Sequence, residues 1–187
     1  MKDRFKELSQ MALEELNEVF SRMEDEDIRP LLEAIKKADR IFLLGAGREG
    51  LSTRAFAMRL MHLGKQAYWI WDDTTPSINE GDLMICACGS ADVGHENYIG
   101  EMAKKNRAEL ILITPSSEGF LLSVADQVIR VPAAAYKAVG EFVSTGQLMG
   151  NLFEQSLLIL YDVLVMMLRE ELGVSTEEMV KRHRNVE

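Results

Sequence analysis

Basic residues and long apolar runs are scarce in this chain of 187 residues. Lys and Arg number 21 against 30 Asp and Glu, which gives a formal net charge of −9. An acidic surface repels nucleic acid and anionic lipid, so the composition disfavours both as partners. The longest apolar run, Leu157–Leu168, is interrupted by Asp162 and is too short to span a bilayer. The first residues are charged and amphipathic, which predicts that no signal peptide opens the chain.

Cysteine is also scarce. The two cysteines, Cys86 and Cys88, lie two positions apart in an apolar run, so on a strand their side chains share one face. A disulfide between them would be badly strained. We therefore expect reduced thiols in a cytoplasmic protein.

The rest of the sequence consists of short apolar runs separated by stretches with helical spacing. They are continuous in hydrophobicity rather than alternating, which is typical of parallel strands covered on both faces. The runs are 41–44, 67–71, 83–88, 110–114 and a weaker one at 128–131. Alternation of strands and helices predicts an α/β fold with a doubly wound parallel sheet. No repeat or boundary divides residues 1–187, so we expect a single domain.

Helices are predicted before, between and after these runs. An amphipathic helix covers Phe5 to Phe20, and a second follows Asp27 with Pro30 in its first turn. Helical spacing over 51–64 and 96–107 predicts two more. A long, nearly all-apolar helix spans about 147–172, and Gly173 ends it.

The loop after the first run, Gly45-Ala-Gly-Arg-Glu-Gly50, is the first candidate site. Ligands of open parallel sheets bind beyond the carboxyl ends of the strands. Gly45 and Gly47 would let backbone N–H groups approach an anion at the start of the next helix, and Arg48 could add a charged bond. A tight turn without a ligand is equally consistent. The spacing also resembles a dinucleotide fingerprint, for which Asp72 or Asp73 would be the ribose-binding acid.

The loop after the third run, Cys88-Gly-Ser-Ala-Asp-Val-Gly94, is a second candidate. Ser90 and Asp92 could bind a phosphate there or simply cap the next helix. Asp92, His95 and Glu96 are a weak candidate for a metal site, because no matching cluster lies elsewhere. Ser116, after the fourth run, is interpreted as part of a turn and cap that could also offer a hydroxyl to phosphate.

Two titratable residues near the C-terminus are candidates for catalysis. Glu154 lies early in the long apolar helix, where a carboxylate is costly unless it is paired or used. It could be a general base or a structural ion-pair partner. Ser175 and Glu178 have capping-box spacing and predict a final short helix. His183 would fall on the apolar side of that helix, as a packed histidine or a functional one.

Several segments together resemble the 6-phospho-3-hexuloisomerase family of sugar isomerase (SIS) domains. The resemblance covers nearly the whole chain in order. It is carried by 45–51, 56–64, Thr75-Pro76, Gly81-Asp82, 149–155, Tyr161-Asp162 and 183–187.

The resemblance implies a three-layer, flavodoxin-like fold around a five-stranded parallel sheet, and a homo-oligomer, dimeric or more typically tetrameric. It implies interconversion of a 3-ketohexose 6-phosphate with fructose 6-phosphate, without a metal or organic cofactor. Glu154 matches the family's catalytic base. His183 matches a histidine thought to reach a neighbouring subunit's site. A base-catalysed proton transfer through an enediolate agrees with a carboxylate in a dry site.

The chain departs from the family pattern at two loops. The family usually has Ser where Glu49 stands, and Ser-Gly-Ser-Gly-Glu-Thr where this chain has Cys88 to Val93. Two hydroxyls of the second loop are therefore missing, at Cys88 and Val93, and Glu49 brings a carboxyl close to the expected phosphate. The alternatives are a phosphosugar-binding protein without catalysis, and an isomerase whose substrate differs because Glu49 hydrogen-bonds sugar hydroxyls.

Overall fold

A computed structural model describes residues 3–186 and contains one sheet of five strands, all parallel. The strands lie in the order β2-β1-β3-β4-β5, which is the flavodoxin-like order. Their bounds are β1 Ile41–Gly45, β2 Ala67–Trp69, β3 Leu83–Ala87, β4 Glu109–Thr114 and β5 Gln127–Arg130. The predicted fold class is confirmed.

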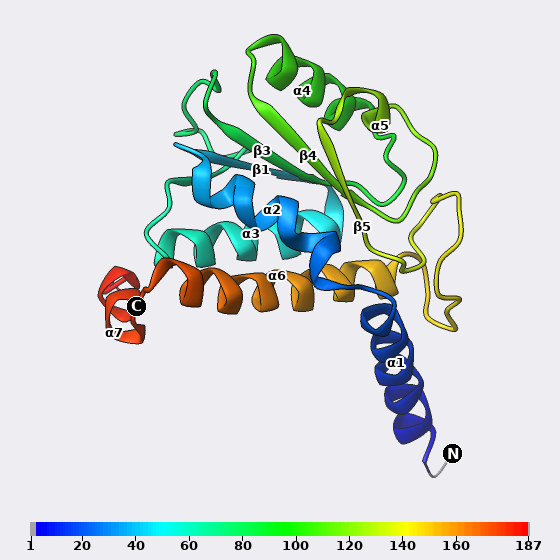
Figure 1. Cartoon of the computed structure of the whole chain (residues 1–187). Coiled ribbons are helices and arrows are strands. Elements are labelled where there is room, and N and C mark those ends of the chain that lie inside the picture. The colour runs from blue at the N-terminus through cyan, green and yellow to red at the C-terminus, as the bar shows by residue number, and fades with distance from the viewer. Residues whose placement is uncertain (1–2, 187) are drawn as a thin grey trace.

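Seven helices surround the sheet in the part of the chain that is described. They are α1 Arg4–Ser21, α2 Asp25–Lys37, α3 Gly47–His62, α4 Gly94–Lys105, α5 Leu121–Val124, α6 Asn151–Leu172 and α7 Thr176–Arg182. Residues of α2, α3 and α6 share a core with one face of the sheet, and α4 and α5 cover the other (Figure 1). Alternate strand residues enter opposite cores: Ile41 and Leu43 pack on the first, Phe42 and Leu44 on the second.

Some element boundaries differ from the sequence-based expectation. β2 ends at Trp69 because the chain turns there: the N–H of Asp72 and the hydroxyl of Thr75 both donate to the Trp69 carbonyl. α6 begins at Asn151 rather than about 147, since Met149 has a left-handed backbone (φ 56°) that no α-helix accommodates.

Two further corrections concern α2 and α7. α2 begins at Asp25, so Pro30 is its sixth residue and lies beyond the first turn; Asp27 instead accepts the N–H of Glu24 at the N-cap. α7 begins with the predicted capping box of Ser175 but ends at Arg182. His183 follows in an extended conformation, so it does not lie on a helix face as predicted.

α6 is long and apolar enough, by length and composition, to cross a membrane, which the shorter run within it did not indicate. Half of its most apolar window is buried inside the protein. Leu157, Leu160, Leu164 and Leu168 from α6 all belong to the core shared with the sheet. Its apolar surface is therefore explained in large part by its place in that core. Cys86 and Cys88 are buried and free, as expected.

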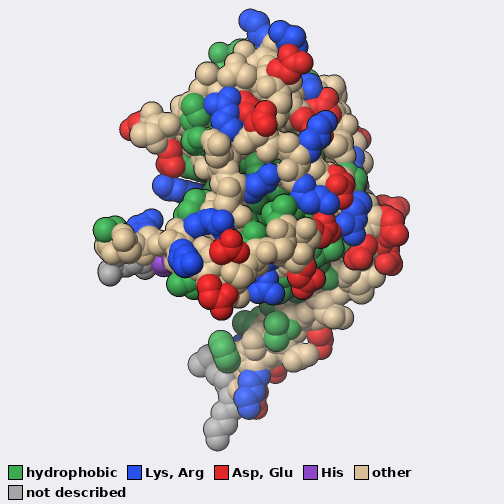
Figure 2. Space-filling view, turned by 60° about the vertical axis from the view of Figure 1, so that its left-hand side comes forward, with side chains coloured by type: hydrophobic (Ala, Val, Ile, Leu, Met, Phe, Trp, Pro, Cys, Tyr) green, Lys and Arg blue, Asp and Glu red, His purple; other side chains and the backbone are tan. Residues whose placement is uncertain are grey.

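α1 projects away from the rest of the fold (Figure 1), with only Val19 of this helix fully buried. Phe5, Leu8 and Leu13 are exposed on it, and green side chains appear on the projecting part in Figure 2. Such a surface is what an oligomer would cover. Assembly of this chain stays a prediction.

Candidate active site

The turn between β1 and α3 has a backbone that only glycine permits. A side chain at Gly50 would place its Cβ 2.7 Å from the carbonyl oxygen of Gly45, and Gly47 has φ +52°. This close approach brings the start of α3 against the end of β1. As a result Arg48 and Glu49 lie in the first turn of α3, beyond the carboxyl edge of the sheet.

A cavity of about 440 Å³ opens at this edge. It lies between the loops that follow β1 and β3, where neighbouring crossovers leave the sheet in opposite directions and ligands of such folds bind. Its other walls are the segment before α6 and the start of α6. The lining residues are Ala46, Gly47, Arg48, Glu49, Gly89, Ser90, Asp92, Val93, Tyr136, Lys137, Met149, Gly150 and Glu154.

Glu154 supplies the carboxylate on the α6 side of the cavity. Its side chain is only 15% exposed, and its Oε2 lies 2.7 Å from Nε of Arg48. The Ser52 hydroxyl donates to the Glu154 carbonyl at 3.2 Å, which ties this turn of α6 to α3. A carboxylate with one ion-pair partner, at the wall of a cavity, can accept a proton from a bound molecule.

Glu49 supplies a second carboxyl, on the α3 side. Its Oε2 accepts the backbone N–H of Gly89 at 3.1 Å, and a Cβ on Gly89 would lie 2.6 Å from its Oε1. Burial raises the pKa of Glu49 to about 8. The hydrogen bond from Gly89 lowers this pKa, whereas the nearby carboxylates of Glu96 and Glu154 raise it further. Glu49 is therefore mostly a neutral acid at pH 7, not the carboxylate that the sequence suggests.

Glu96, the third residue of α4, is a fully buried carboxyl behind this wall. Its pKa is raised because burial disfavours the ionised form, with smaller opposing effects from Cys88 and His95. Burial likewise raises the pKa of the Cys88 thiol. Burial therefore disfavours the ionised form of all three groups on the interior side of the site, Glu49, Glu96 and Cys88.

Three non-glycine residues at this site have left-handed backbones. They are Ala91 (φ 54°), Lys137 (φ 61°) and Met149 (φ 56°). Lys137 and Met149 line the cavity, and Ala91 lies in the loop of Ser90. Each such residue costs on the order of 1–3 kcal/mol, and residues of this kind cluster at functional sites. Their placement supports the assignment of this cavity as the site.

The structure brings most of the predicted site residues together: Gly47, Arg48, Glu49, Ser90, Asp92 and Glu154 all line the cavity. Gly45 lies beneath the turn and lines an adjoining groove instead. Ser116 is buried outside the cavity wall, where its hydroxyl donates to the Glu118 carbonyl and accepts the N–H of Val139. It therefore supports the loop that carries Lys137, and a direct contact of Ser116 with phosphate does not fit this position.

His183 does not line this cavity. The ring of His183 stacks on the buried ring of His62, with centroids 5.1 Å apart. His62 is the last residue of α3. Arg48 is in the first turn of the same helix, about 20 Å away along its axis. A contribution of His183 to a neighbouring subunit's site stays a prediction. Burial lowers the pKa of His62, with Arg59 and His183 adding to the effect.

Sequence reasoning missed Tyr136, Lys137 and Met149. They belong to the segment of 131–150, which contains no long regular element and gives no periodic signal. The one signal that the sequence offered for these three residues was the position of this segment directly before the helix that carries Glu154.

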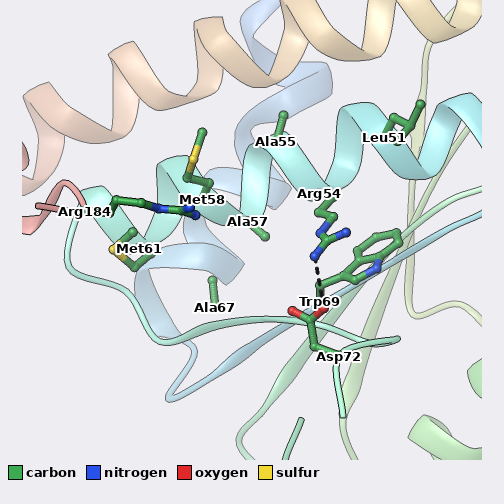
Figure 3. A pocket seen from close by; sticks show the side chains of 10 residues that line it. All are labelled: Leu51, Arg54, Ala55, Ala57, Met58, Met61, Ala67, Trp69, Asp72 and Arg184. Carbon is green, nitrogen blue, oxygen red and sulfur yellow. Dashed lines mark hydrogen bonds and ion pairs between the residues drawn. The ribbon is translucent and has the colours of Figure 1, made fainter. Parts of the chain in front are cut away.

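A separate groove of about 430 Å³ runs along the exposed side of α3 (Figure 3). Apolar side chains, including Met58, Met61 and Trp69, form most of it, and Arg54 pairs with Asp72 at 3.2 Å. The Asp72 side chain in this groove is 47% exposed, whereas the Glu154 side chain is 15% exposed. Within residues 3–186 no group of three or more His, Cys, Asp or Glu side chains is arranged to hold a metal ion.

Comparison with known proteins decides the family. No family model matches the chain. A 3-hexulose-6-phosphate isomerase of Bacillus subtilis is 35% identical over 175 residues, which cover 94% of this chain and 95% of that protein. The chain belongs to the 3-hexulose-6-phosphate isomerase family. A second member, from Mycobacterium gastri, is 35% identical over 177 residues, covering 95% of this chain and 88% of that one.

Solved structures agree with membership of the 3-hexulose-6-phosphate isomerase family. A crystal structure from Methanococcus jannaschii, whose description infers a 3-hexulose-6-phosphate isomerase function, has a TM-score of 0.84 at 29% identity and covers 97% of this chain and 99% of that one. The Vibrio vulnificus NanR protein, solved with ManNAc-6P, shares the fold (TM-score 0.74, 20% identity, 97% of this chain and 67% of that one). The predicted SIS-type family is confirmed.

Proposed function

We propose that this chain interconverts a 3-hexulose 6-phosphate with fructose 6-phosphate, with Glu154 as the base. The observation that carries the proposal is the Glu154 carboxylate, held 2.7 Å from Arg48 at the wall of the cavity beyond β1 and β3. The named activity of the 35% identical relatives supports the choice of reaction.

The reaction moves a carbonyl from C3 to C2 of the sugar. Glu154 removes the proton at C2 of the 3-hexulose, and the electrons form an enediolate across C2 and C3. A proton returns at C3, and the proton of the C2 hydroxyl passes to the oxygen on C3. C2 is thereby oxidised to a ketone and C3 is reduced to an alcohol, so the reaction is an oxidation and reduction within one molecule. Arg48 beside the base would stabilise negative charge that develops on the enediolate oxygen.

The opposite side of the cavity is suited to the phosphate ester. Ser90 and the loop of Gly89 precede α4, a helix of 12 residues whose positive end favours an anion. Lys137 lines the same cavity. Binding of a group remote from the reacting carbons supplies the positioning that the proton transfer needs.

The experiment compares wild type with Glu154→Gln by wash-in of solvent deuterium at C3 of fructose 6-phosphate, followed by NMR. We expect Glu154→Gln to lower the exchange rate on the order of 10²- to 10⁴-fold. Affinity for fructose 6-phosphate should change only a few-fold, since the amide keeps the shape of the side chain. Glu170→Gln is the matched control, because Glu170 is an exposed acid near the other end of α6.

Two outcomes would contradict the proposal. Exchange that survives Glu154→Gln would remove this residue as the base. Tight binding of fructose 6-phosphate by wild type without any exchange would favour the alternative of a phosphosugar-binding protein that performs no catalysis.

A further inference from the structure

Glu49 is a carboxyl group in the wall of a cavity to which the proposed function assigns an anionic substrate. Its neighbours do not neutralise it. Arg48, the preceding residue, pairs with Glu154. The groups that act electrostatically on Glu49 include the carboxyls of Glu96 and Glu154. An ionised Glu49 here would repel both a phosphate dianion and the catalytic carboxylate.

We propose that Glu49 recognises the phosphate ester as a neutral carboxylic acid, accepting the Gly89 N–H with one oxygen and donating its O–H to a phosphate oxygen. This inference rests on the proposed function and assigns to Glu49 the contact that a hydroxyl side chain would otherwise supply. A protonated carboxyl has the donor that a phosphate dianion needs, whereas an ionised carboxyl only accepts.

The geometry leaves the second oxygen of Glu49 for this role. Oε2 is held by the Gly89 amide at 3.1 Å, at the entry to the loop that contains Ser90. Glu49 itself is a lining residue of the cavity, together with Ser90 and Lys137. The donor O–H on Oε1 would therefore act beside Ser90, on the side of the cavity assigned to the ester.

The groups around Glu49 determine how it titrates. Arg48 is on its own helix, Cys88 and Asp92 are on the loop after β3, Glu96 is on α4, Glu154 on α6 and Lys137 on the segment before α6. Burial raises the pKa of Glu96 and of the Cys88 thiol, and it raises the pKa of Glu49 to about 8. A phosphate monoester is already a dianion above its second pKa of about 6, so between pH 7 and 9 the titration of Glu49 can be followed apart from that of the ligand.

The consequence is affinity that depends on pH. If only the neutral form of Glu49 binds the ester, the apparent Kd for fructose 6-phosphate rises about tenfold between pH 7 and pH 9, as the competent fraction falls. Binding at pH 9 must then take up about 0.9 proton for each ligand bound.

The experiment is isothermal titration calorimetry of fructose 6-phosphate at pH 7, 8 and 9, in buffers of different ionisation enthalpy. Wild type should show the tenfold weakening and the proton uptake. Glu49→Gln, which is neutral at every pH, should show a Kd constant within about twofold and no uptake. Glu49→Ser provides a second neutral variant with a shorter hydroxyl side chain. Glu101→Gln is the matched control: Glu101 is an exposed acid on α4 that does not line the cavity, and this variant should keep the wild-type pH dependence.

The outcomes separate this inference from the proposed function. Equal pH dependence in wild type and Glu49→Gln, or a wild-type Kd that is constant from pH 7 to 9, overturns the role of Glu49 and leaves the isomerase proposal intact. A lack of fructose 6-phosphate binding by wild type at every pH overturns both. Deuterium exchange lost in Glu154→Gln with normal pH-dependent binding supports both.

Discussion

The buried proton on Glu49 should be visible in the stability of the protein without any ligand. In the unfolded chain this carboxyl has an ordinary pKa near 4.5, whereas in the folded protein it is about 8. The folded state therefore holds a proton that the unfolded state has released, across the interval from about pH 4.5 to 8. The associated stability is present in full below pH 4.5 and is lost as the pH rises through 8.

The perturbation is Glu49→Gln, which keeps the shape and removes the titration. At about 1.4 kcal/mol per pH unit, the change in pKa sets an upper limit of about 5 kcal/mol. Solvent reaches part of this side chain, and Glu96 and Glu154 share the field, so we expect about 2 kcal/mol. Glu49→Gln should thus gain about 2 kcal/mol on wild type between pH 5 and pH 9, or roughly 4–8 °C in Tm for a chain of this size.

Urea unfolding followed by circular dichroism at pH 5, 7 and 9 measures this difference. Groups that do not interact with Glu49 titrate alike in both proteins, so their contributions cancel when the two curves are subtracted. The difference then reports Glu49 together with its coupling to Glu96 and Glu154. Stability curves of wild type and Glu49→Gln that run parallel, within about 0.5 kcal/mol, would refute the reasoning, because they would mean that Glu49 is ionised in the folded protein.

Two predictions concern the framework of the site. Gly50→Ala places a Cβ against the backbone of Gly45 and should cost about 1–3 kcal/mol in urea unfolding. It should also lower deuterium exchange, because Arg48 and Glu49 move with α3. The control is Gly94→Ala, whose Cβ meets nothing within 4 Å and which should change neither stability nor exchange. Asp82→Ala removes the 2%-exposed partner of Arg40 and should cost about 3 kcal/mol. A loss below 1 kcal/mol in that variant would show that the pair contributes no more than an exposed one.

Much of the fold could be predicted from the sequence because its signals are local. Continuous apolar runs identified every strand, and the close approach of Gly45 and Gly50 explains why glycine stands at both positions. The errors lie where a tertiary contact decides. β2 ends early because the Trp69 carbonyl captures two later donors, and α6 starts late because Met149 is left-handed.

The site was only partly predictable for a similar reason. The positions of Arg48 and Ser90 follow from the strand ends that precede them, and Glu154 was identified as a carboxylate in a long apolar helix. The raised pKa of Glu49 could not be predicted in the same way, because it depends on burial and on the nearby carboxyl of Glu96. A helical pattern alone does not show that Glu96 lies close to Glu49. The sequence suggested a charge that repels phosphate, whereas the structure contains a neutral acid.

The hydrogen bond from the Ser52 hydroxyl to the Glu154 carbonyl joins α3 to α6 next to the site. Together with the buried contact of Thr53 with the Tyr161 hydroxyl, at 3.0 Å, it fastens α3 to α6 at two successive residues. These bonds hold the turn of α3 that follows Arg48 against the turn of α6 that carries Glu154. The other walls of the cavity, which carry Ser90, Lys137 and Met149, are not fastened by these two bonds.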